Sequence, residues 1–442
     1  MGHESFRPGI THFRCVGVGV GPANLSLASL LHSRPDVPNL FLDRKESFGW
    51  HDGQQIPGTS LQVSQFKDLV SLADPANPFS FLSYLHAKGR VYHFLNARFD
   101  DVPRPEFRNY LAWASRNNEN VVFGEGVEEV DFDDGLGAFT VRTARRTVTA
   151  ENVVVGVGSR PWVPPLGEHQ LGPTQFHVSD YMANAQDVGG KRVVVIGGGQ
   201  SGAEAFLDLI SRGGWDLPRR VSWISRRENY LPIDDSPFTN DRYMPSHADY
   251  FYGLPRERRH ALNSRNVLSS DGISESTLRE IYQGIYMHRF VDGNEDLVAL
   301  HPGREVFDVR PGPFGGWEVR ARHTQEAESV EKFETDVVVW ATGYRPAATE
   351  FLAPLGGRLE REGEELRVDE DYAVRWDGPA DRRIFVQNGV RGQRGLADPN
   401  LSLNAWRSRR IADRLCGVRG DEQLASFIEW SSKTSQDERW TA

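Results

Sequence analysis

Short apolar runs alternate with stretches of helical periodicity along most of this 442-residue chain. Residues 13–20 read as a buried strand, residues 21–33 as the helix that follows, and residues 40–43 as the next parallel strand. The same order of strand, turn, helix and strand recurs at residues 191–225. This alternation is typical of an α/β fold with parallel sheets.

The repetition extends beyond these two units. A polar hairpin pattern followed by an apolar strand occupies residues 139–158, and a similar pattern occupies residues 317–343. Both strands end in G-x-R-P, at Gly158 and Gly343. Because turn, hairpin and strand recur together, we predict two related dinucleotide-binding domains, the second inserted within the first.

The second unit contains a glycine pattern that suits a nucleotide. Gly197, Gly199 and Gly202 form G-x-G-x-x-G at a strand-to-helix turn, where the glycines permit a tight turn, close approach of a pyrophosphate and close helix packing. A purely structural turn is the alternative. At the end of the next strand, Arg226 and Arg227 replace the usual acidic residue, which favours the 2′-phosphate of NADPH over a solvated basic turn.

The first unit departs from this pattern. Gly17, Gly19 and Gly21 give G-x-G-x-G, and when Gly17 is aligned with Gly197, Pro22 falls at the third glycine. Proline is tolerated in a first helical turn, where its missing N–H would lack a partner. Asp43 ends the next strand, as expected of an acidic residue that holds the ribose of FAD.

We therefore expect two Rossmann-like domains, for FAD and NADPH, with a small, mostly helical substrate region. The predicted FAD domain covers residues 1–187 and returns at residues 336–442, with the strand at 336–343 in its sheet. The predicted NADPH domain covers residues 188–335, with the substrate segment at about 236–290.

Composition narrows the function further. The net charge is −10 and no long basic run occurs, which argues against a nucleic-acid partner. Neither a signal-peptide core nor a membrane-spanning run is apparent, so we expect a cytoplasmic protein. Cys15 and Cys416 cannot form the closely spaced redox pair of a disulfide reductase. The histidines show no metal-ligand spacing, so we predict no metal site.

Several longer stretches resemble a known family. GVGVGPANL, GWHDGQQ, SLQVSQFKDLVSLADPANPFSFLSYLH, VVVIGGGQSGAEAF, SSDGIS, VVVWATGYRP and LADPNLSLNAWRS are similar to the flavin-dependent N-hydroxylating monooxygenases of siderophore biosynthesis, especially to the members that act on lysine. The motifs occur in order and nearly from end to end. The resemblance implies FAD, NADPH, an amine substrate and O2, and a homotetramer.

The resemblance also implies site residues. Flavin contacts would come from Gly17, Gly19, Gly21, Trp50, His51 and Gln62, and the NADPH loop from Gly197, Gly199, Gln200, Ser201 and Gly202. Lys67 would meet the α-carboxylate of the substrate. Asn240, Asn266 and Ser402 would line the rest of the substrate site.

Without the resemblance, plainer interpretations compete. Trp50 and His51 would suit ordinary packing, Lys67 a solvated lysine on an amphipathic segment, and Asn240 a turn. One departure from the family is visible: Arg394 precedes Gly395 where we expect histidine, which puts the geometry of the C-terminal loop in question.

The implied chemistry requires no catalytic side chain. NADPH would reduce FAD, O2 would give a C4a-hydroperoxyflavin, and a neutral substrate amine would attack it. Deprotonating a lysine amine near neutrality costs about 4 kcal/mol, and burial can shift its pKa by about 3–5 units, so a dry pocket supplies most of this without a base. L-lysine is the expected substrate; L-ornithine, cadaverine or putrescine are alternatives, and a non-catalytic redox sensor is a remote one.

Overall fold

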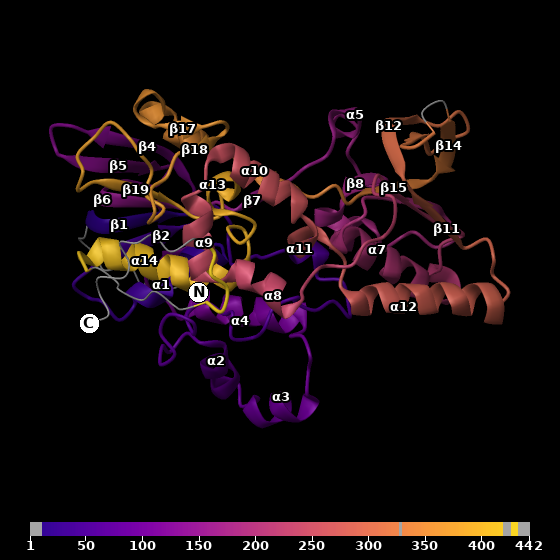
Figure 1. Ribbon diagram of the computed structural model, residues 1–442, viewed down its shortest axis with the longest axis horizontal. Helices are drawn as coiled ribbons and strands as arrows, with labels where there is room; N and C mark the ends of the chain where they lie inside the picture. Colours follow the sequence, from indigo (N-terminus) through magenta and orange to yellow (C-terminus); the bar gives the residue numbers. More distant parts are fainter. Residues whose placement is uncertain (1–10, 327–328, 419–425, 432–442) are drawn as a thin grey trace.

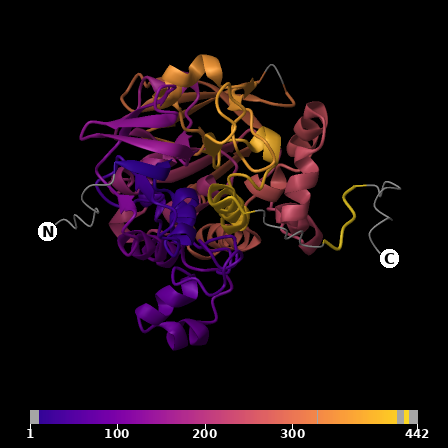
Figure 2. The same ribbon diagram turned by 90° about the vertical axis from the view of Figure 1, so that its left-hand side faces the viewer.

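Two sheets, the first mixed and the second parallel, each have a buried core and form the body of the protein. The computed structural model describes residues 11–326, 329–418 and 426–431. In Figure 1 the first sheet lies to the left and the second to the right, with a group of helices between and in front of them. The view turned by 90° in Figure 2 shows α2 and α3 projecting away from this body.

The first sheet combines a parallel part with an antiparallel hairpin. Its strands are β1 (His12–Val18), β2 (Asn39–Leu42), β3 (Val121–Val122), β4 (Val127–Asp133), β5 (Ala138–Thr143), β6 (Thr147–Val155) and β19 (Arg383–Val386). The order is β3-β2-β1-β6-β5-β4, and β19 also pairs with β6. The first half of β6 pairs antiparallel with β5, its second half pairs parallel with β19, and β1 pairs parallel with it from Thr149 to Val155. The strands β3, β2, β1 and β6 thus lie side by side and parallel, as expected of a dinucleotide-binding sheet.

The second sheet is entirely parallel. It consists of β8 (Gln175–His177), β9 (Arg192–Ile196), β10 (Arg220–Ser225), β11 (Val298–Pro302) and β15 (Val337–Trp340), in the order β11-β10-β9-β15-β8. A separate antiparallel sheet, β12 (Arg304–Pro311), β13 (Trp317–His323) and β14 (Val330–Thr335), covers one of its faces.

One sequence expectation is wrong. The strand at 336–343 was expected to return to the first sheet, but β15 pairs with β9 and β8 in the second. The duplication explains this, because β15 follows its hairpin as β6 follows its own, and each pairs with the first strand of its own unit. β8, expected within the first domain, also belongs to the second sheet. The domain limits themselves remain a prediction.

The two G-x-R-P segments leave their sheets side by side. β7 (Ser159–Pro161) and β16 (Tyr344–Pro346) pair antiparallel, with Tyr344 opposite Pro161. The Trp162 N–H donates to the Gly343 carbonyl at 3.0 Å, and the Arg345 guanidinium lies over the Trp162 ring. The two copies of the motif therefore form the place where the chain passes between the two nucleotide-binding units, and we call this strand pair the paired crossing.

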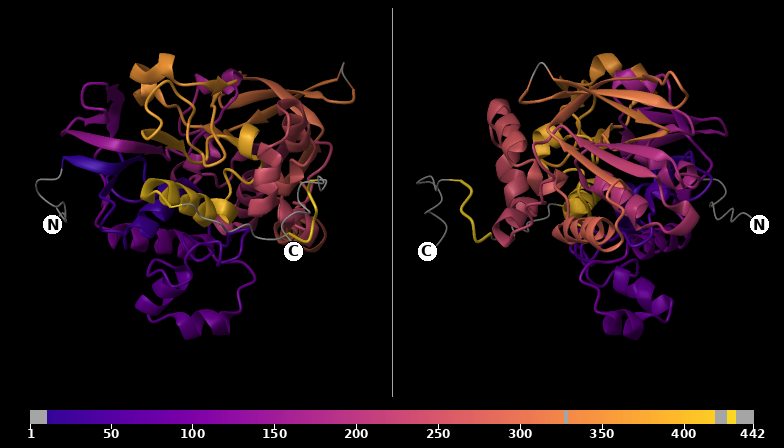
Figure 3. Two further views of the ribbon diagram at one scale, coloured as in Figure 1. Left: turned by 60° about the vertical axis from the view of Figure 1, so that its left-hand side comes forward. Right: turned by 90° about the vertical axis from the view of Figure 1, so that its right-hand side faces the viewer.

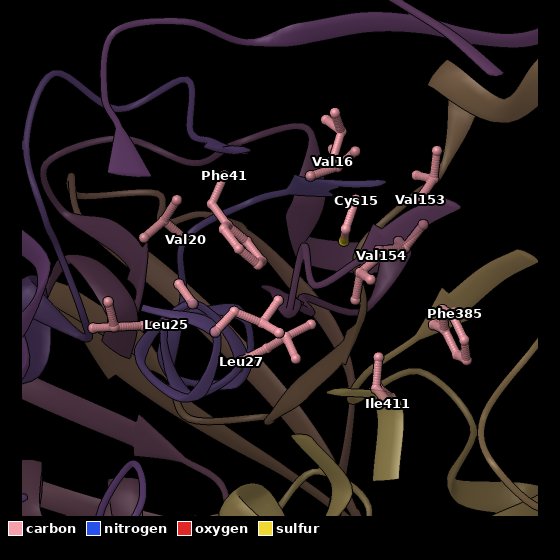
Figure 4. Packing of buried hydrophobic residues seen from close by; sticks show 14 of the residues in the cluster. Cys15, Val16, Val20, Leu25, Leu27, Phe41, Val153, Val154, Phe385 and Ile411 are labelled. Carbon is pink, nitrogen blue, oxygen red and sulfur yellow. The ribbon is translucent and has the colours of Figure 1, made fainter. Parts of the chain in front are cut away.

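Helices bury the faces of the first sheet. They are α1 (Pro22–Leu31), α4 (Arg104–Arg116) and α14 (Asn404–Cys416). Farther from the sheet, α2 (Phe81–Ala87) packs on α4 through Tyr84 and Tyr110, and α3 (Val91–Ala97) has no buried residue. Nine of the ten residues of α1 are buried, because the sheet lies on one side of it and α14 on the other. In Figure 4 the ring of Phe41 of β2 lies above α1, and Leu27 of α1 lies on the side of the helix toward Val154 of β6.

A helical region separates the two sheets from solvent on one side, as Figure 3 shows. Its helices are α8 (Pro237–Asn240), α9 (Pro245–Tyr252), α10 (Arg256–Arg265), α11 (Leu268–Asp271) and α12 (Glu275–Tyr286), and a short α13 (Arg391–Arg394) precedes the C-terminal loop. The helix α7 (Gln200–Ser211) belongs to the second unit and packs on its sheet. Tyr243 and Ala248 pack against Ala397 and Leu403, so the helical segment and the C-terminal loop share one small core. The segment predicted to form the substrate region is helical, as expected, and its role remains a prediction.

Candidate functional site

The two glycine turns have the same geometry, but in a different register from the one we expected. The Gly19 N–H donates to Leu42 O, the last carbonyl of β2, and the Gly197 N–H donates to Ile224 O, near the end of β10. Both glycines have positive φ, +87° and +136°. Gly19 therefore corresponds to Gly197, and the alignment of Gly17 with Gly197 is wrong.

The structure also shows which residue takes the place of the third glycine of G-x-G-x-x-G in the first turn. With Gly19 matched to Gly197, Asn24 takes the place of Gly202, and Pro22 does not. The Asn24 amide donates to the carbonyls of Gly19 and Val18, at 2.8 and 3.1 Å, and accepts from Gln387 at 2.9 Å. Gly202 has no room for a side chain, since a Cβ would lie 2.3 Å from Gly197 O. In the first unit the buried Asn24 amide joins the helix to the turn by hydrogen bonds, whereas in the second unit Gly202 allows the helix to pack directly on the turn.

Gly21 and Gly199 are the open positions of the two turns. Each is the N-terminal cap of its helix, α1 or α7, in an extended conformation. A Cβ at Gly21 would meet only Gly156 O at 3.9 Å, and one at Gly199 only Asp271 O at 3.7 Å. A helix N-terminus with uncovered backbone N–H groups is suited to a phosphate. Both turns therefore fit the pyrophosphate of a dinucleotide.

Gly17 and Asp43 have structural functions in the first unit. Gly17 lies inside β1, where a Cβ would be 2.1 Å from the Phe41 ring, so packing explains this glycine. The Asp43 carboxylate accepts from the N–H groups of Val20, at 2.8 Å, and Lys45, at 2.9 Å. Asp43 thus stands beside the first turn, as a ribose-binding residue must.

Arg226 and Arg227 differ in what they contact. Arg227 donates to the carbonyls of Gly198 and Asp271, at 3.0 and 2.8 Å, and so braces the second turn. Arg226 is largely exposed at the end of β10, with only a 3.7 Å contact to Glu305. Of the two, Arg226 has the more exposed guanidinium, as a 2′-phosphate requires.

The segment around Trp50 lies between the two units. Trp50 is half-buried and packs against Phe107, and the His51 ring lies 6.0 Å from the ring of Tyr344. Solvent reaches His51, yet the surrounding protein, together with the positive charge of Arg104, lowers its pKa to about 4. Gln62 is exposed. The neutral imidazole faces Tyr344 at the paired crossing of the two units, and its contact with a flavin remains a prediction.

Lys67 is a half-buried cation whose loop is held in place by its neighbour. The buried Asp68 carboxylate accepts four hydrogen bonds, from the N–H groups of Val70, Ser71 and Phe81 and from the Ser71 hydroxyl, at 2.7–2.9 Å. Asp68 is therefore fully used. The Lys67 ammonium has no ion-pair partner among the described residues, and burial lowers its pKa.

The other expected substrate residues lie on the helical region and the C-terminal loop. Asn240 ends α8, is exposed, and donates to Asp235 O at 2.8 Å. Asn266 follows α10 and is half-buried. Ser402 is buried, and its hydroxyl donates to the Asn400 side chain at 2.7 Å. Their contacts to a substrate remain predictions.

Arg394 ties the C-terminal loop to α9. Its fully buried guanidinium lies between the rings of Tyr252 and Tyr372, 5.0 and 4.5 Å from their centroids, and donates to Asp249 at 3.0 Å. The Asn404 amide, at the start of α14 directly after this loop, donates to Pro22 O at 3.0 Å, beside the first turn. The arginine that departs from the family pattern thus docks this loop onto α9, within the segment predicted to bind the substrate.

A buried ion pair joins the two units, and sequence reasoning missed it. Arg104 of α4 donates to both carboxylate oxygens of Glu204 in α7, at 2.8 and 2.6 Å. Gln200, one turn earlier in α7, donates to the same carboxylate at 3.0 Å and accepts from the Ser274 N–H at 2.8 Å. The second turn is thereby fixed relative to the first unit. No local pattern signals a pair so distant in sequence.

A second missed contact lies at the same crossing. The Tyr344 hydroxyl donates to the Gln54 side chain at 2.6 Å, which joins the segment after His51 to β16. Within the described residues there is no group of three or more His, Cys, Asp or Glu side chains placed to hold a metal. Nor does any described helix have the length and apolarity needed to cross a membrane.

His177 makes the crossing sensitive to pH. Its Nδ1 accepts from the Ser179 N–H at 3.1 Å and its Nε2 donates to Gly343 O at 3.1 Å; the bond from Ser179 requires a neutral ring, since a protonated Nδ1 can no longer accept. Burial lowers the pKa from 6.5 to about 4. Because the folded pKa is below the unfolded one, the stabilisation is complete above pH 6.5 and is lost as the pH falls through 4.

We expect this loss to be about 2–3 kcal/mol of unfolding free energy. The His177→Asn variant keeps a side-chain acceptor for Ser179 but does not titrate. Chemical denaturation at several pH values should therefore give a shallower decline below pH 6.5 for the variant than for the wild type. Parallel declines would contradict this account of His177.

Two nucleotide-binding units with matched open turns, paired crossings and a shared helical region define a two-nucleotide oxidoreductase architecture. Solved structures support this class. A cadaverine monooxygenase from Erwinia amylovora bound to FAD superposes with a TM-score of 0.89 at 28% identity, covering 96% of this chain and 99% of that one. An ornithine N-hydroxylase from Kutzneria sp. 744, with reduced FAD, NADP+ and L-ornithine, gives 0.84 at 28% identity, covering 92% and 99%.

Sequence comparison identifies the family. The model of the L-lysine 6-monooxygenase/L-ornithine 5-monooxygenase family matches residues 11–346. L-lysine N6-monooxygenase of Escherichia coli is 38% identical over 424 residues, which cover 95% of this chain and 98% of that protein. The chain belongs to this family of N-hydroxylating monooxygenases, and the resemblance inferred from its motifs is confirmed.

Proposed function

We propose that the protein uses FAD, NADPH and O2 to hydroxylate the terminal amine of L-lysine, for a hydroxamate siderophore or a related metabolite. The observation that carries the choice of an amino acid is Lys67. Its ammonium is half-buried and has no ion-pair partner among the described residues, while the adjacent carboxylate is already saturated. A cation in this state is stabilised by an incoming carboxylate.

The open turn at Gly21 would hold the pyrophosphate of FAD, with Asp43 beside its ribose. The turn at Gly199 would hold the pyrophosphate of NADPH, with Arg226 at its 2′-phosphate. When bound, FAD supplies the oxygen-activating chemistry with electrons from NADPH. The fit rests on the open space at both helix N-termini.

The residues of the chain bind the substrate and hold the two nucleotide-binding turns in position. Lys67 fixes the carboxylate of the substrate, so that its far amine extends toward the flavin side. The Arg104–Glu204 pair and Gln200 hold the second turn at a constant position relative to the first unit. His51 is neutral there and does not repel a cationic substrate. A dry pocket favours the neutral amine, so we assign no general base.

Cofactor choice gives a direct prediction. We expect NADPH to be preferred over NADH, and Arg226→Ala to lower kcat/KM for NADPH roughly tenfold or more, since a charge-assisted hydrogen bond contributes about 1.5–3 kcal/mol. Activity with NADH should hardly change. Arg220→Ala, an exposed arginine at the other end of β10, is the matched control. Equal kcat/KM for both cofactors in the wild type would refute this assignment.

A diamine such as cadaverine is the second candidate, favoured by the likeness to the Erwinia enzyme. L-ornithine is a further candidate; it is one methylene shorter than L-lysine, so the depth of the substrate pocket would decide between the two. We place the reaction in a reducing cytoplasm, where the two unpaired cysteines, Cys15 and Cys416, are stable. The expected homotetramer also remains a prediction.

The experiment that tests the proposal compares NADPH oxidation with hydroxylamine formation. In the presence of L-lysine we expect one hydroxylamine per NADPH, and without an amine only slow oxidation that yields hydrogen peroxide. A protein that binds both nucleotides but forms no hydroxylamine with any amine would instead be a redox sensor.

A further inference from the structure

A cavity of about 300 Å³ lies between the parallel sheet of the second unit and the antiparallel sheet that covers it. The parallel sheet contributes β9, β10 and β11 to its walls, and the antiparallel sheet contributes β14, which lies above the parallel sheet in Figure 1. The Thr335 hydroxyl donates to Arg192 O at 2.8 Å and so joins β14 to β9. No residue of the second turn, and neither Arg226 nor Lys67, belongs to the lining. The cavity is therefore separate from the predicted nucleotide and substrate sites.

Positive charge gathers around this cavity without matching negative charge. Arg192 and Arg220, the first residues of β9 and β10, are partners in the parallel register of these strands. Arg192 is neutralised by Asp336 at 2.9 Å and by Glu334 at 3.1 Å. Arg220 and Lys332 also line the cavity, and neither has an ion-pair partner among the described residues. Because like charges on neighbouring strands repel each other, an anion placed between them would be stabilised.

Polar groups without partners line the deeper part of the same cavity. His301 Nε2 is buried and has no hydrogen-bond partner in the part of the chain that the structure describes. Its ring meets the Phe333 ring edge-on, with 4.7 Å between the centroids, and the two rings form one wall. Ser222 is 6% exposed, and its hydroxyl makes no hydrogen bond within the described residues. An anionic oxygen can accept from such donors and from a neighbouring cation at once.

The surrounding charges keep the His301 ring neutral. Burial lowers the pKa of its imidazole, and the positive charges of Arg304 and Arg220 lower it further, while Glu331 opposes them. Glu331 is itself paired with Arg304 at 3.0 Å. At pH 7 the neutral ring can therefore donate through Nε2 to an anionic oxygen in the cavity.

We propose that this cavity binds a small dianion that carries carboxylate or phosphate groups. Arg220 and Lys332 neutralise its two charges, and Ser222 and His301 donate to its oxygens. The volume lies at the lower limit of the roughly 300–1,000 Å³ of small-molecule sites, so the ligand is much smaller than a dinucleotide. Since the two cations come from different sheets, the bound anion ties the antiparallel sheet to the parallel one. The inference is independent of the amine that the protein hydroxylates.

Isothermal titration calorimetry of the FAD-containing protein, saturated with NADP+, tests this with malonate and pyrophosphate as probes. At least one of them should bind as a single molecule per chain, and acetate, with one charge, should bind much more weakly. Arg220→Gln and Lys332→Gln should each weaken binding about tenfold or more, since each removes a charge-assisted hydrogen bond. Arg219→Gln is the matched control, because it removes the same charge at an exposed neighbour that does not line the cavity.

Two further variants locate the bound anion. Lys67→Met removes the cation assigned to the substrate carboxylate, and Arg226→Gln removes the one assigned to the 2′-phosphate; both should bind the probes like the wild type. Tighter binding of malonate indicates a carboxylate ligand, and tighter binding of pyrophosphate a phosphate ligand. The probe that binds should also raise the melting temperature of the wild type but not that of Lys332→Gln.

Two results would overturn the proposal. One is the absence of binding of both probes at millimolar concentration. The other is binding that is lost with Lys67→Met or Arg226→Gln but kept in Arg220→Gln and Lys332→Gln, because the anion would then occupy the substrate or the NADPH site.

Discussion

We expect Lys67→Ala to raise KM for L-lysine strongly, while the reduction of FAD by NADPH stays nearly normal. The substrate carboxylate would lose its only assigned cation, and removing one partner of a partly buried charged pair costs about 2–5 kcal/mol. Asp68 holds the loop through its own four hydrogen bonds, so the backbone should keep its position. Steady-state hydroxylamine assays and stopped-flow flavin reduction measure the two effects separately.

Two controls sharpen this result. Lys67→Arg keeps the charge and should retain more lysine affinity than Lys67→Met, which keeps only the stem. Lys332→Ala, at an exposed lysine of β14, should behave like the wild type. With cadaverine, Lys67→Ala should improve or leave unchanged the KM, since a second cation in the substrate no longer meets Lys67. An unchanged KM for lysine in Lys67→Ala would instead favour a diamine substrate.

Substitution of one glycine turn should abolish binding of one cofactor and leave the other bound. We expect Gly21→Val to purify folded but without yellow colour, and Gly199→Val to keep FAD while its reduction by NADPH fails. Both positions are extended helix caps with open space, so valine should disturb the fold little but obstruct the approach of a pyrophosphate. Absorbance of the purified proteins and stopped-flow reduction provide the readout.

Gly213→Val is the matched control, because Gly213 is also extended and uncrowded but lies beyond the far end of α7. Substitution of Gly19 is less informative, since its positive φ and the Gly156 carbonyl 2.7 Å from a Cβ would strain the turn itself. Loss of the same cofactor from both valine variants would show that the assignment of two sites is wrong.

Periodicity was sufficient to predict the two strand-turn-helix units, because each pairs an apolar strand with a helix whose buried face repeats. It could not set the register of the first turn. Gly17, Gly19 and Gly21 look alike in sequence, and only the fold distinguishes a glycine that makes room for Phe41 from one that needs positive φ. The equivalence of Asn24 with Gly202 rests likewise on three-dimensional hydrogen bonds.

The placement of β15 failed for a related reason. A duplicated unit offers the same apolar strand two equivalent sheets, and the pairing partner is decided by tertiary packing. In the candidate site, too, local motifs were predictable from the sequence and contacts between distant segments were not. Lys67 and the open turns were accessible from motifs, whereas the Arg104–Glu204 pair, the Tyr344–Gln54 contact and the burial of Arg394 depend on segments that meet only after folding.

A competition between amines tests the central claim most directly. The wild-type protein, with NADPH and air, would receive equal concentrations of L-lysine, L-ornithine and cadaverine, and mass spectrometry would quantify the hydroxylated products at low conversion. The ratios of product give the ratios of kcat/KM. We predict that N6-hydroxylysine dominates and that Lys67→Ala abolishes this preference. Dominance of hydroxylated cadaverine in the wild type would contradict the account.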